Sequence, residues 1–292
     1  EADSDCADAH ALAAEAHVAL AGLTSVPSRP ELERARAAAR RALELDADSA
    51  AAHGVLGQIA LLVDHDWPHA EARLLAGLRC APGVAASHAR YGWALTLNGR
   101  HAEARAAYLE ARDLDPLSLL YRAHEALIAI YERDWPLAAT GLDDVLATAP
   151  EHLVARVLRA ALHLYAGEIE AGRIGFEALD AAHPGLSIGA CGIAQARALA
   201  GDTCGAEQLL TGLLERERAG WVSPYQIAMV LARMGRLEAA VEQLERAATA
   251  ADFNFACVGV DPAFDDLRAD AAGAALLRRH GFGHLVPARV LR

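Results

Sequence analysis

The chain has 292 residues, of which 54% are apolar, and a formal net charge of −12; all 27 of its basic residues are arginine. This composition excludes a disordered chain and argues against nucleic-acid binding, because phosphate neutralisation requires a basic face. No apolar run approaches the roughly 18 residues that a membrane span requires. The abundance of alanine and leucine, which lose little on entering a helix, predicts an all-helical protein.

Helix-turn-helix units with a period of 34 residues are expected from about residue 6 to residue 257. Prolines recur with this stride, and a glycine recurs in one phase to supply the left-handed C-cap of each first helix. Small residues lie seven positions before the turn glycine and five positions after it, and they let the two helices approach closely. A bulky residue four positions after the second small residue fills the space between neighbouring units. The prolines are at 82, 116, 150 and 184, the turn glycines are Gly99, Gly167, Gly201 and Gly235, and the bulky residues are Leu74, Tyr108, Leu142, Phe176, Leu210 and Leu244.

Three segments depart from this period. The first unit has the insertion TSVPSRP at 24–30, and the sixth has Arg218 where proline is expected. The segment VDPAFDDLRADAAGAALLRRHGF at 260–282 breaks the phase altogether. An array of repeats needs a differently patterned end to cover its last apolar face, so we expect a helical cap here.

The repeat resembles the tetratricopeptide repeat, most closely over 85–118. The matching positions are Gly92, Leu95, Gly99, Ala104, Tyr108, Ala111 and Pro116. The resemblance implies an all-α, right-handed superhelical solenoid of about seven units over residues 1–257, with capping helices and a tail over 258–292. The segment at 260–282 also resembles the tail that follows such repeats in many bacterial transcriptional and signalling regulators.

Catalytic and metal sites are not expected. Asp64, His65, Asp66 and His69 form the densest group of potential ligands, but they span a turn between helices and Pro68 lies among them. The five cysteines have no metal-binding or disulfide spacing, and we interpret them as buried thiols in a reducing compartment. The sequence contains no glycine-rich loop of the kind that binds the phosphate of a cofactor. The sequence therefore predicts a protein without catalytic residues, metal or cofactor.

A binding groove is expected on the first helices of the repeats, because the resembled family lines its inner wall with them. Its inward positions give a mainly apolar and aromatic surface, part of which packs between neighbouring helices. The groove-binding candidates are Arg90, Trp93, Leu97, His124, Leu127, Tyr131, Leu158, Tyr165, Gln195, Tyr225, Met229 and Arg233.

Two functions are compatible with a repeat array that has such a groove. The first is an interaction scaffold that binds a protein partner's peptide or helix in the groove. The second is a regulatory domain of a longer bacterial signalling protein, acting by self-association, for example as a homodimer, or by small-ligand binding. The chain begins at Glu1 without methionine, which we interpret as a piece of a longer protein, and we expect a cytoplasmic location, or a periplasmic one behind a membrane anchor.

Overall fold

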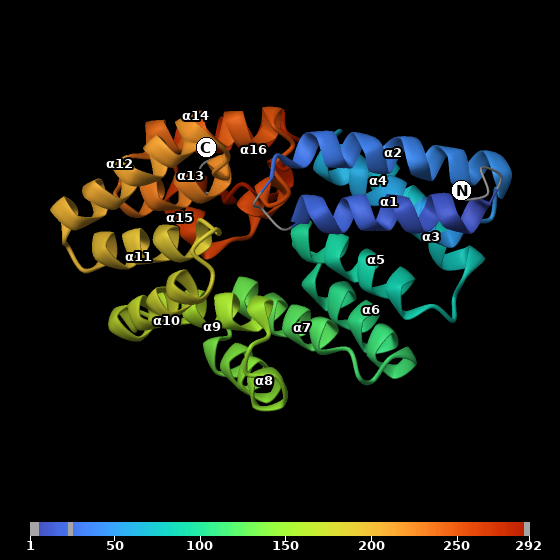
Figure 1. The fold of residues 1–292 in the computed structure, drawn as a ribbon, viewed down its shortest axis with the longest axis horizontal. Helices are drawn as coiled ribbons and strands as arrows, with labels where there is room; N and C mark the ends of the chain where they lie inside the picture. Colours follow the sequence, from blue (N-terminus) through green and yellow to red (C-terminus); the bar gives the residue numbers. More distant parts are fainter. Residues whose placement is uncertain (1–5, 23–25, 289–292) are drawn as a thin grey trace. The chain divides into compact units, whose positions relative to one another are not determined.

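The structure is a computed structural model that describes residues 6–22 and 26–288. These residues form an all-α helical repeat fold, and no strand occurs among them (Figure 1). The chain divides into two compact units, one with residues up to Ser118 together with Ala250–Ala256, the other with Leu119–Thr249 and the residues from Cys257 onward.

The first unit contains three helical pairs. They are α1 (Ala7–Gly22) with α2 (Ser28–Leu45), α3 (Ala50–Leu62) with α4 (Trp67–Cys80), and α5 (Ala85–Leu97) with α6 (His101–Leu114).

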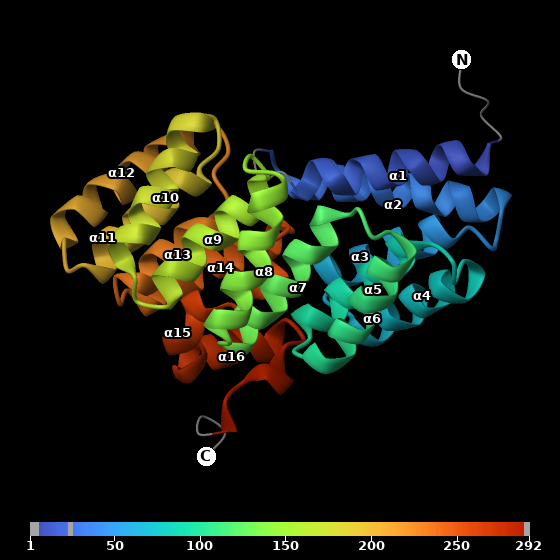
Figure 2. The ribbon, with the colours of Figure 1, turned by 90° about the horizontal axis from the view of Figure 1, so that it is seen from below.

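The second unit contains four further pairs and the C-terminal helices. The pairs are α7 (Leu119–Glu132) with α8 (Trp135–Thr148), α9 (Leu153–Tyr165) with α10 (Ile169–Ala182), α11 (Ile188–Leu199) with α12 (Thr203–Ala219), and α13 (Pro224–Arg233) with α14 (Leu237–Thr249). After the 3-10 helix η1 (Phe255–Gly259) come η2 (Pro262–Phe264), α15 (Asp265–Ala269), α16 (Ala271–Arg279) and η3 (Gly283–Leu285). Figure 2 shows these last elements in red. His280 at the end of α16 bonds Glu245 of α14 over 2.9 Å.

The glycine turns have the backbone conformation that the period predicts. Gly99, Gly167, Gly201 and Gly235 all have φ between 72° and 84°, the left-handed region in which a side chain is strained. His65 and Arg133 stand one period before and after Gly99, and they adopt the same conformation with φ of 51° and 66°. The turn geometry is therefore kept even where the glycine is absent.

The helix crossings also follow the predicted phase. The bulky residues that the period places between helices, from Leu74 to Leu244, are all at most 3% exposed. A Cβ atom added to Gly92 would lie 3.0 Å from the Tyr108 ring, and one added to Gly57 would lie 2.6 Å from Leu74. A side chain at Gly57 would force Leu74 to move, and one at Gly92 would press closely on the Tyr108 ring, so glycine suits both crossings.

A proline follows the second helix in four of the seven pairs. The helices α4, α6, α8 and α10 all end two residues before a proline and have 14 residues each. In α12, where Arg218 takes the place of proline, the helix runs to Ala219 and has 17 residues. A proline would have interrupted the backbone hydrogen bonds of this last turn.

Candidate functional site

In the second unit, two tyrosines from different helices bind one carboxylate. The Tyr165 hydroxyl at the end of α9 donates to Oδ1 of Asp261, and the Tyr225 hydroxyl of α13 donates to Oδ2, each over 2.9 Å. Asp261 is 7% exposed. We call these three residues the Asp261 clamp; it holds the C-terminal segment 257–268 against the helices.

The local sequence Asp-Pro-Ala-Phe presents this carboxylate. Asp261 is the N-cap of η2 and accepts a hydrogen bond of 2.8 Å from the Ala263 backbone N–H. Pro262 follows at the first helical position, where its missing N–H costs nothing. The turn of η2 then directs Phe264 back to Tyr225, with the ring centroids 5.2 Å apart in an edge-on arrangement. The single turn of η2 thus makes both a polar contact, through Asp261, and an aromatic contact, through Phe264.

Two arginines hold the backbone around the clamp. Arg268 is only 5% exposed and donates to the carbonyl oxygens of Val258 and Asp261, both over 2.8 Å, and to the Asp265 carboxylate. Arg133 donates to Asp265 over 2.6 Å and to the Val260 carbonyl over 3.4 Å. Burial lowers the pKa of Arg268, and the nearby carboxylates of Asp265 and Asp261 oppose this effect. The segment is therefore fixed through its main chain as well as its side chains.

The tyrosine hydroxyls around the segment 257–268 are hydrogen-bond donors. Burial, and next the negative charge of Asp261, raise the pKa of Tyr165 and of Tyr225 well above the ordinary value. Burial also raises the pKa of Tyr131, with Cys257 as the next cause. Since all three hydroxyls stay protonated at neutral pH, the face offers neutral O–H donors that suit a carboxylate acceptor.

The chain is similar in sequence and fold to tetratricopeptide-repeat proteins. The tetratricopeptide-repeat model matches residues 225–254, which cover α13 and α14. A tetratricopeptide repeat protein from Parabacteroides merdae is 15% identical with a TM-score of 0.57, over 82% of this chain and 93% of that one. The chain carries a tetratricopeptide repeat, and its fold is that of tetratricopeptide-repeat proteins.

Two other similar structures come from distant proteins. The type IV pilus biogenesis factor PilW is 20% identical with a TM-score of 0.55, over 75% of this chain and 98% of that one. Human IFIT1, in a dimer with m7Gppp-AAAA, is 14% identical with a TM-score of 0.57, over 87% of this chain and 65% of that one. At these identities the likeness concerns the fold alone. No curated protein sequence matches the chain.

Tetratricopeptide repeats serve in general as non-catalytic scaffolds that bind protein or peptide partners. Among the described residues, no group of three or more His, Cys, Asp or Glu side chains is placed to hold a metal ion. In the turn before α4, Asp66 caps that helix by accepting from the His69 N–H over 3.0 Å, and Asp64 pairs with Arg36. No helix in the described ranges has the length and apolar character to cross a bilayer.

The predicted groove residues of the second unit lie on α7, α9, α11 and α13. Three of them are brought together around the segment 257–268: Tyr165 and Tyr225 on Asp261, and Tyr131 on Cys257. The Arg233 guanidinium lies 5.4 Å from the Tyr165 ring centroid, a cation–π contact. The others are either half-buried (His124, Leu127, Leu158) or buried (Gln195, Met229).

The three predicted residues of the first unit also contact its own side chains. Trp93 lies against Phe253 with ring centroids 5.4 Å apart, and Arg90 forms an ion pair with Glu15. Leu97 is fully buried. That any of the twelve candidates binds a ligand stays a prediction. Asp261, Arg268 and Phe253 are not among the predicted residues, although an aspartate directly before proline is a recognisable N-cap signal.

The cysteines differ in exposure. None of the five forms a disulfide. Cys191 is buried, and burial raises its pKa to about 12, so it stays a thiol. Cys80 and Cys204 are exposed, so the expectation of buried thiols is wrong for these two; Cys80 is the last residue of α4, and Cys204 is the second residue of α12.

His124 is expected to make stability depend on pH. Burial, and next the charge of His152, lower the pKa of His124 to about 4. The unfolded chain binds this proton below about pH 6.5 and the folded chain only below about 4, so stability is complete above pH 6.5 and falls as the pH drops toward 4, by up to ~3 kcal/mol. His124→Gln should flatten this part of the curve of unfolding free energy against pH. Replacing the exposed His284 by glutamine is the control, and equal slopes for wild type and His124→Gln would contradict the assignment.

Proposed function

We propose that this protein is a non-enzymatic interaction scaffold in which the face of α9 and α13 that bears Tyr165 and Tyr225 binds a partner segment with an aspartate followed by proline and an aromatic residue. The observation that carries the proposal is the Asp261 clamp, in which both oxygens of one carboxylate are bound by tyrosines of two repeats. A surface that already holds a peptide segment by side chain and main chain has the elements of a peptide site.

The physical chemistry of the clamp favours a carboxylate partner. Neutral hydroxyl donors compensate a buried carboxylate without the desolvation of a second charge, and the ring of Phe264 adds apolar contact beside Tyr225. A partner that lacks the carboxylate would leave the hydroxyls of Tyr165 and Tyr225 without an acceptor, and this energetic cost would make binding selective.

Binding of a partner would compete with the segment 257–268. A tethered segment has an effective concentration in the millimolar range, so a free peptide must displace a strong competitor. This competition supports a regulatory element in the function, because a partner gains access only when the segment leaves the face. One site could therefore serve both as a scaffold for a partner and as a point of regulation.

A peptide titration of the full chain tests the proposal. A fluorescent peptide with the sequence of residues 256–270 should not bind the wild-type chain, because the tethered segment fills the face. The Asp261→Ala chain, whose segment has lost the clamp, should bind it and raise the fluorescence anisotropy. Adding Tyr165→Phe and Tyr225→Phe to that variant should abolish the binding.

The matched ligand control is the same peptide with its aspartate replaced by asparagine, which should bind about tenfold more weakly or not at all. Circular dichroism of each variant shows whether the helices are retained; if Asp261→Ala is unfolded, Phe264→Ala loosens the segment and keeps the clamp residues. A folded variant that binds neither peptide, or both equally, would exclude carboxylate recognition at this face.

Location and oligomeric state complete the proposal. The five free cysteines support a reducing compartment, and we propose a cytoplasmic location. Cell fractionation tests this location, and light scattering at two concentrations tests whether the chain forms a homodimer. A monomer that binds the peptide would favour the scaffold over self-association as the mechanism.

A further inference from the structure

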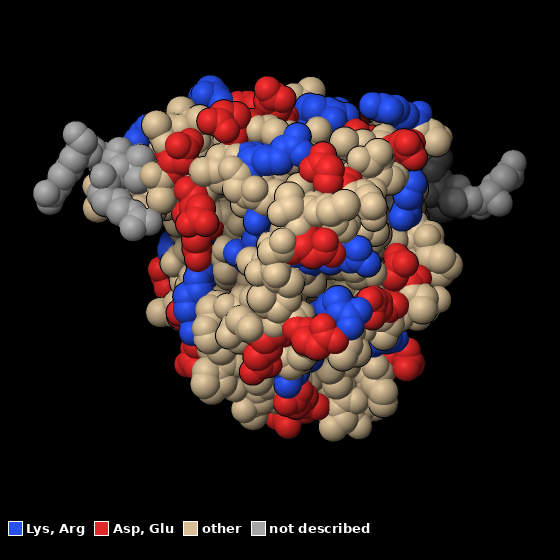
Figure 3. Space-filling model, turned by 90° about the vertical axis from the view of Figure 1, so that its left-hand side faces the viewer, with Lys and Arg blue, Asp and Glu red and all other residues tan. Residues whose placement is uncertain are grey.

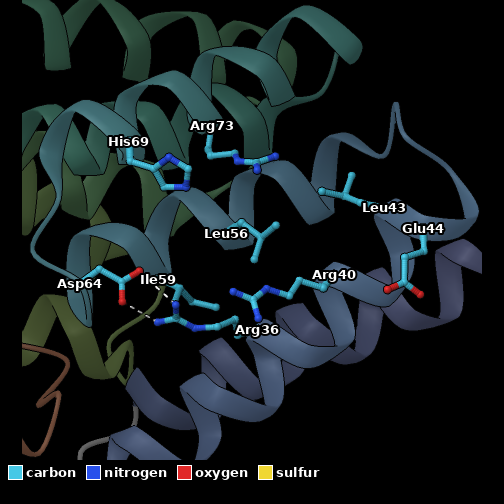
Figure 4. Close-up of a pocket in the computed structure, with 9 residues that line it drawn as sticks. All are labelled: Arg36, Arg40, Leu43, Glu44, Leu56, Ile59, Asp64, His69 and Arg73. Atoms are coloured by element: carbon cyan, nitrogen blue, oxygen red, sulfur yellow. Dashed lines mark hydrogen bonds and ion pairs between the residues drawn. The ribbon is translucent and has the colours of Figure 1, made fainter.

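A pocket with a cationic rim opens in the first unit, away from the Asp261 clamp. It lies among α2, α3 and α4 and has a volume of about 440 Å³. Figure 4 shows Arg36 and Arg40 of α2 on one side, Arg73 and His69 of α4 on the other, and Leu56 of α3 between them. Arginines from two helices therefore face one cavity.

The acidic groups at this pocket already have arginine partners. Asp64 accepts two hydrogen bonds from Arg36, at 2.8 and 3.1 Å, and Glu44 pairs with Arg41 over 3.0 Å. These pairs neutralise Asp64, Glu44 and Arg36 at the pocket. They leave no carboxylate of the lining to compensate Arg40 and Arg73.

Arg40 and Arg73 are thus the uncompensated charges of the pocket. Within the described part of the chain, neither forms an ion pair, and the Arg73 guanidinium lies 3.5 Å from Nδ1 of His53. Arg40 is exposed and Arg73 is half-buried. They present planar donor arrays to the cavity, and such arrays suit phosphate oxygens.

The remaining lining is apolar. Leu43 and Leu56 are half-buried, so their side chains offer hydrocarbon surface beside the charged rim, whereas Ile59 beneath them is 1% exposed. A ligand that fits this division has one strongly anionic end and one apolar end.

The face in Figure 3 shows a different pattern. Its described arginines lie interspersed with acidic side chains, and no broad area of that face is basic alone. That surface has many ion pairs, whereas the pocket combines two arginines without an ion pair and the half-buried side chains of Leu43 and Leu56. This combination distinguishes the pocket from a charged surface whose side chains are all paired.

We propose that this pocket binds a phosphate monoester with a small apolar ester group. Arg40 and Arg73 bind the dianionic phosphate, whose charge matches their two positive charges, and the ester group packs on Leu56. His69 lies at the rim as a further donor. The site goes beyond the proposed scaffold function, since it uses none of the clamp residues.

Isothermal titration calorimetry at low ionic strength tests the pocket, with phenyl phosphate as the probe and the full chain as the receptor. Phenyl phosphate should bind the wild-type chain. Arg40→Gln and Arg73→Gln should each weaken the binding about tenfold or more, because each removes a bidentate donor. Arg79→Gln changes an exposed arginine of the same helix α4 outside the pocket and should alter the affinity by less than about twofold.

Two further ligands separate the contributions of charge and shape. Inorganic phosphate should bind more weakly than phenyl phosphate, since it leaves the apolar floor uncovered. Benzoate should bind more weakly because it carries one negative charge. The proposal is overturned if phenyl phosphate releases no heat, if benzoate or inorganic phosphate binds as tightly, or if Arg79→Gln lowers the affinity as much as Arg40→Gln does.

Discussion

The Gly192→Ala variant is expected to be less stable than the wild-type chain by about 3 kcal/mol or more. Gly192 lies on α11, and a Cβ atom there would fall 2.1 Å from Cγ of Phe176 on α10. The ring is only 3% exposed and packed in the core between α9 and α11, so it has no free space into which it can turn. One methyl group must therefore separate two helices, and urea unfolding followed by circular dichroism measures the cost.

Gly212→Ala is the matched control for this prediction. It is the same substitution within a helix, α12, but no atom lies within 4 Å of the added Cβ. The lower entropy of the unfolded chain should stabilise this variant by roughly 0.4–1 kcal/mol. In the double variant Gly192→Ala with Phe176→Leu, the smaller side chain should restore part of the loss. Equal midpoints for Gly192→Ala and Gly212→Ala would mean that α10 and α11 do not approach this closely.

The period of the sequence predicts most of the fold because its causes are local. The left-handed turn at Gly99 and the close crossing of Gly92 over Tyr108 each depend on residues fewer than 20 positions apart. A glycine or a proline restricts the backbone wherever it stands, so its spacing can be read directly. The exceptions at His65 and Arg133 could not be predicted, because only the surrounding helices force a non-glycine residue into that conformation.

The sites, by contrast, depend on distant residues. Tyr165 and Asp261 are 96 positions apart, and no repeat pattern relates them. The sequence predicted Tyr165 and Tyr225 as binding positions from their place in the repeat and predicted the C-terminal segment as a cap, but it did not connect the two. The pairing of Arg36 with Asp64, which leaves Arg40 and Arg73 uncompensated, is likewise a property of side-chain geometry and not of spacing.

The Arg268→Met variant is expected to lower the stability of the second unit by about 3–5 kcal/mol. Methionine can fill much of the volume of Arg268, but it cannot donate to the carbonyl oxygens of Val258 and Asp261, which would lose the donor at 2.8 Å. The Asp265 carboxylate would lose one of its two arginine partners. Buried acceptors without donors carry their full desolvation cost, so the loss should exceed that of an exposed ion pair.

Hydrogen exchange detected by mass spectrometry locates this loss. Exchange should rise first in the segment 257–268 and on the adjacent α13, because Arg268 connects the backbone on both sides of the clamp. Arg278→Met, a change of an exposed arginine on α16, should leave the exchange of this segment at the wild-type rate. If both variants behave alike, Arg268 does not hold the segment; if only Arg268→Met exposes it, that variant should also bind the free 256–270 peptide, which connects the stability of the clamp to the proposed recognition.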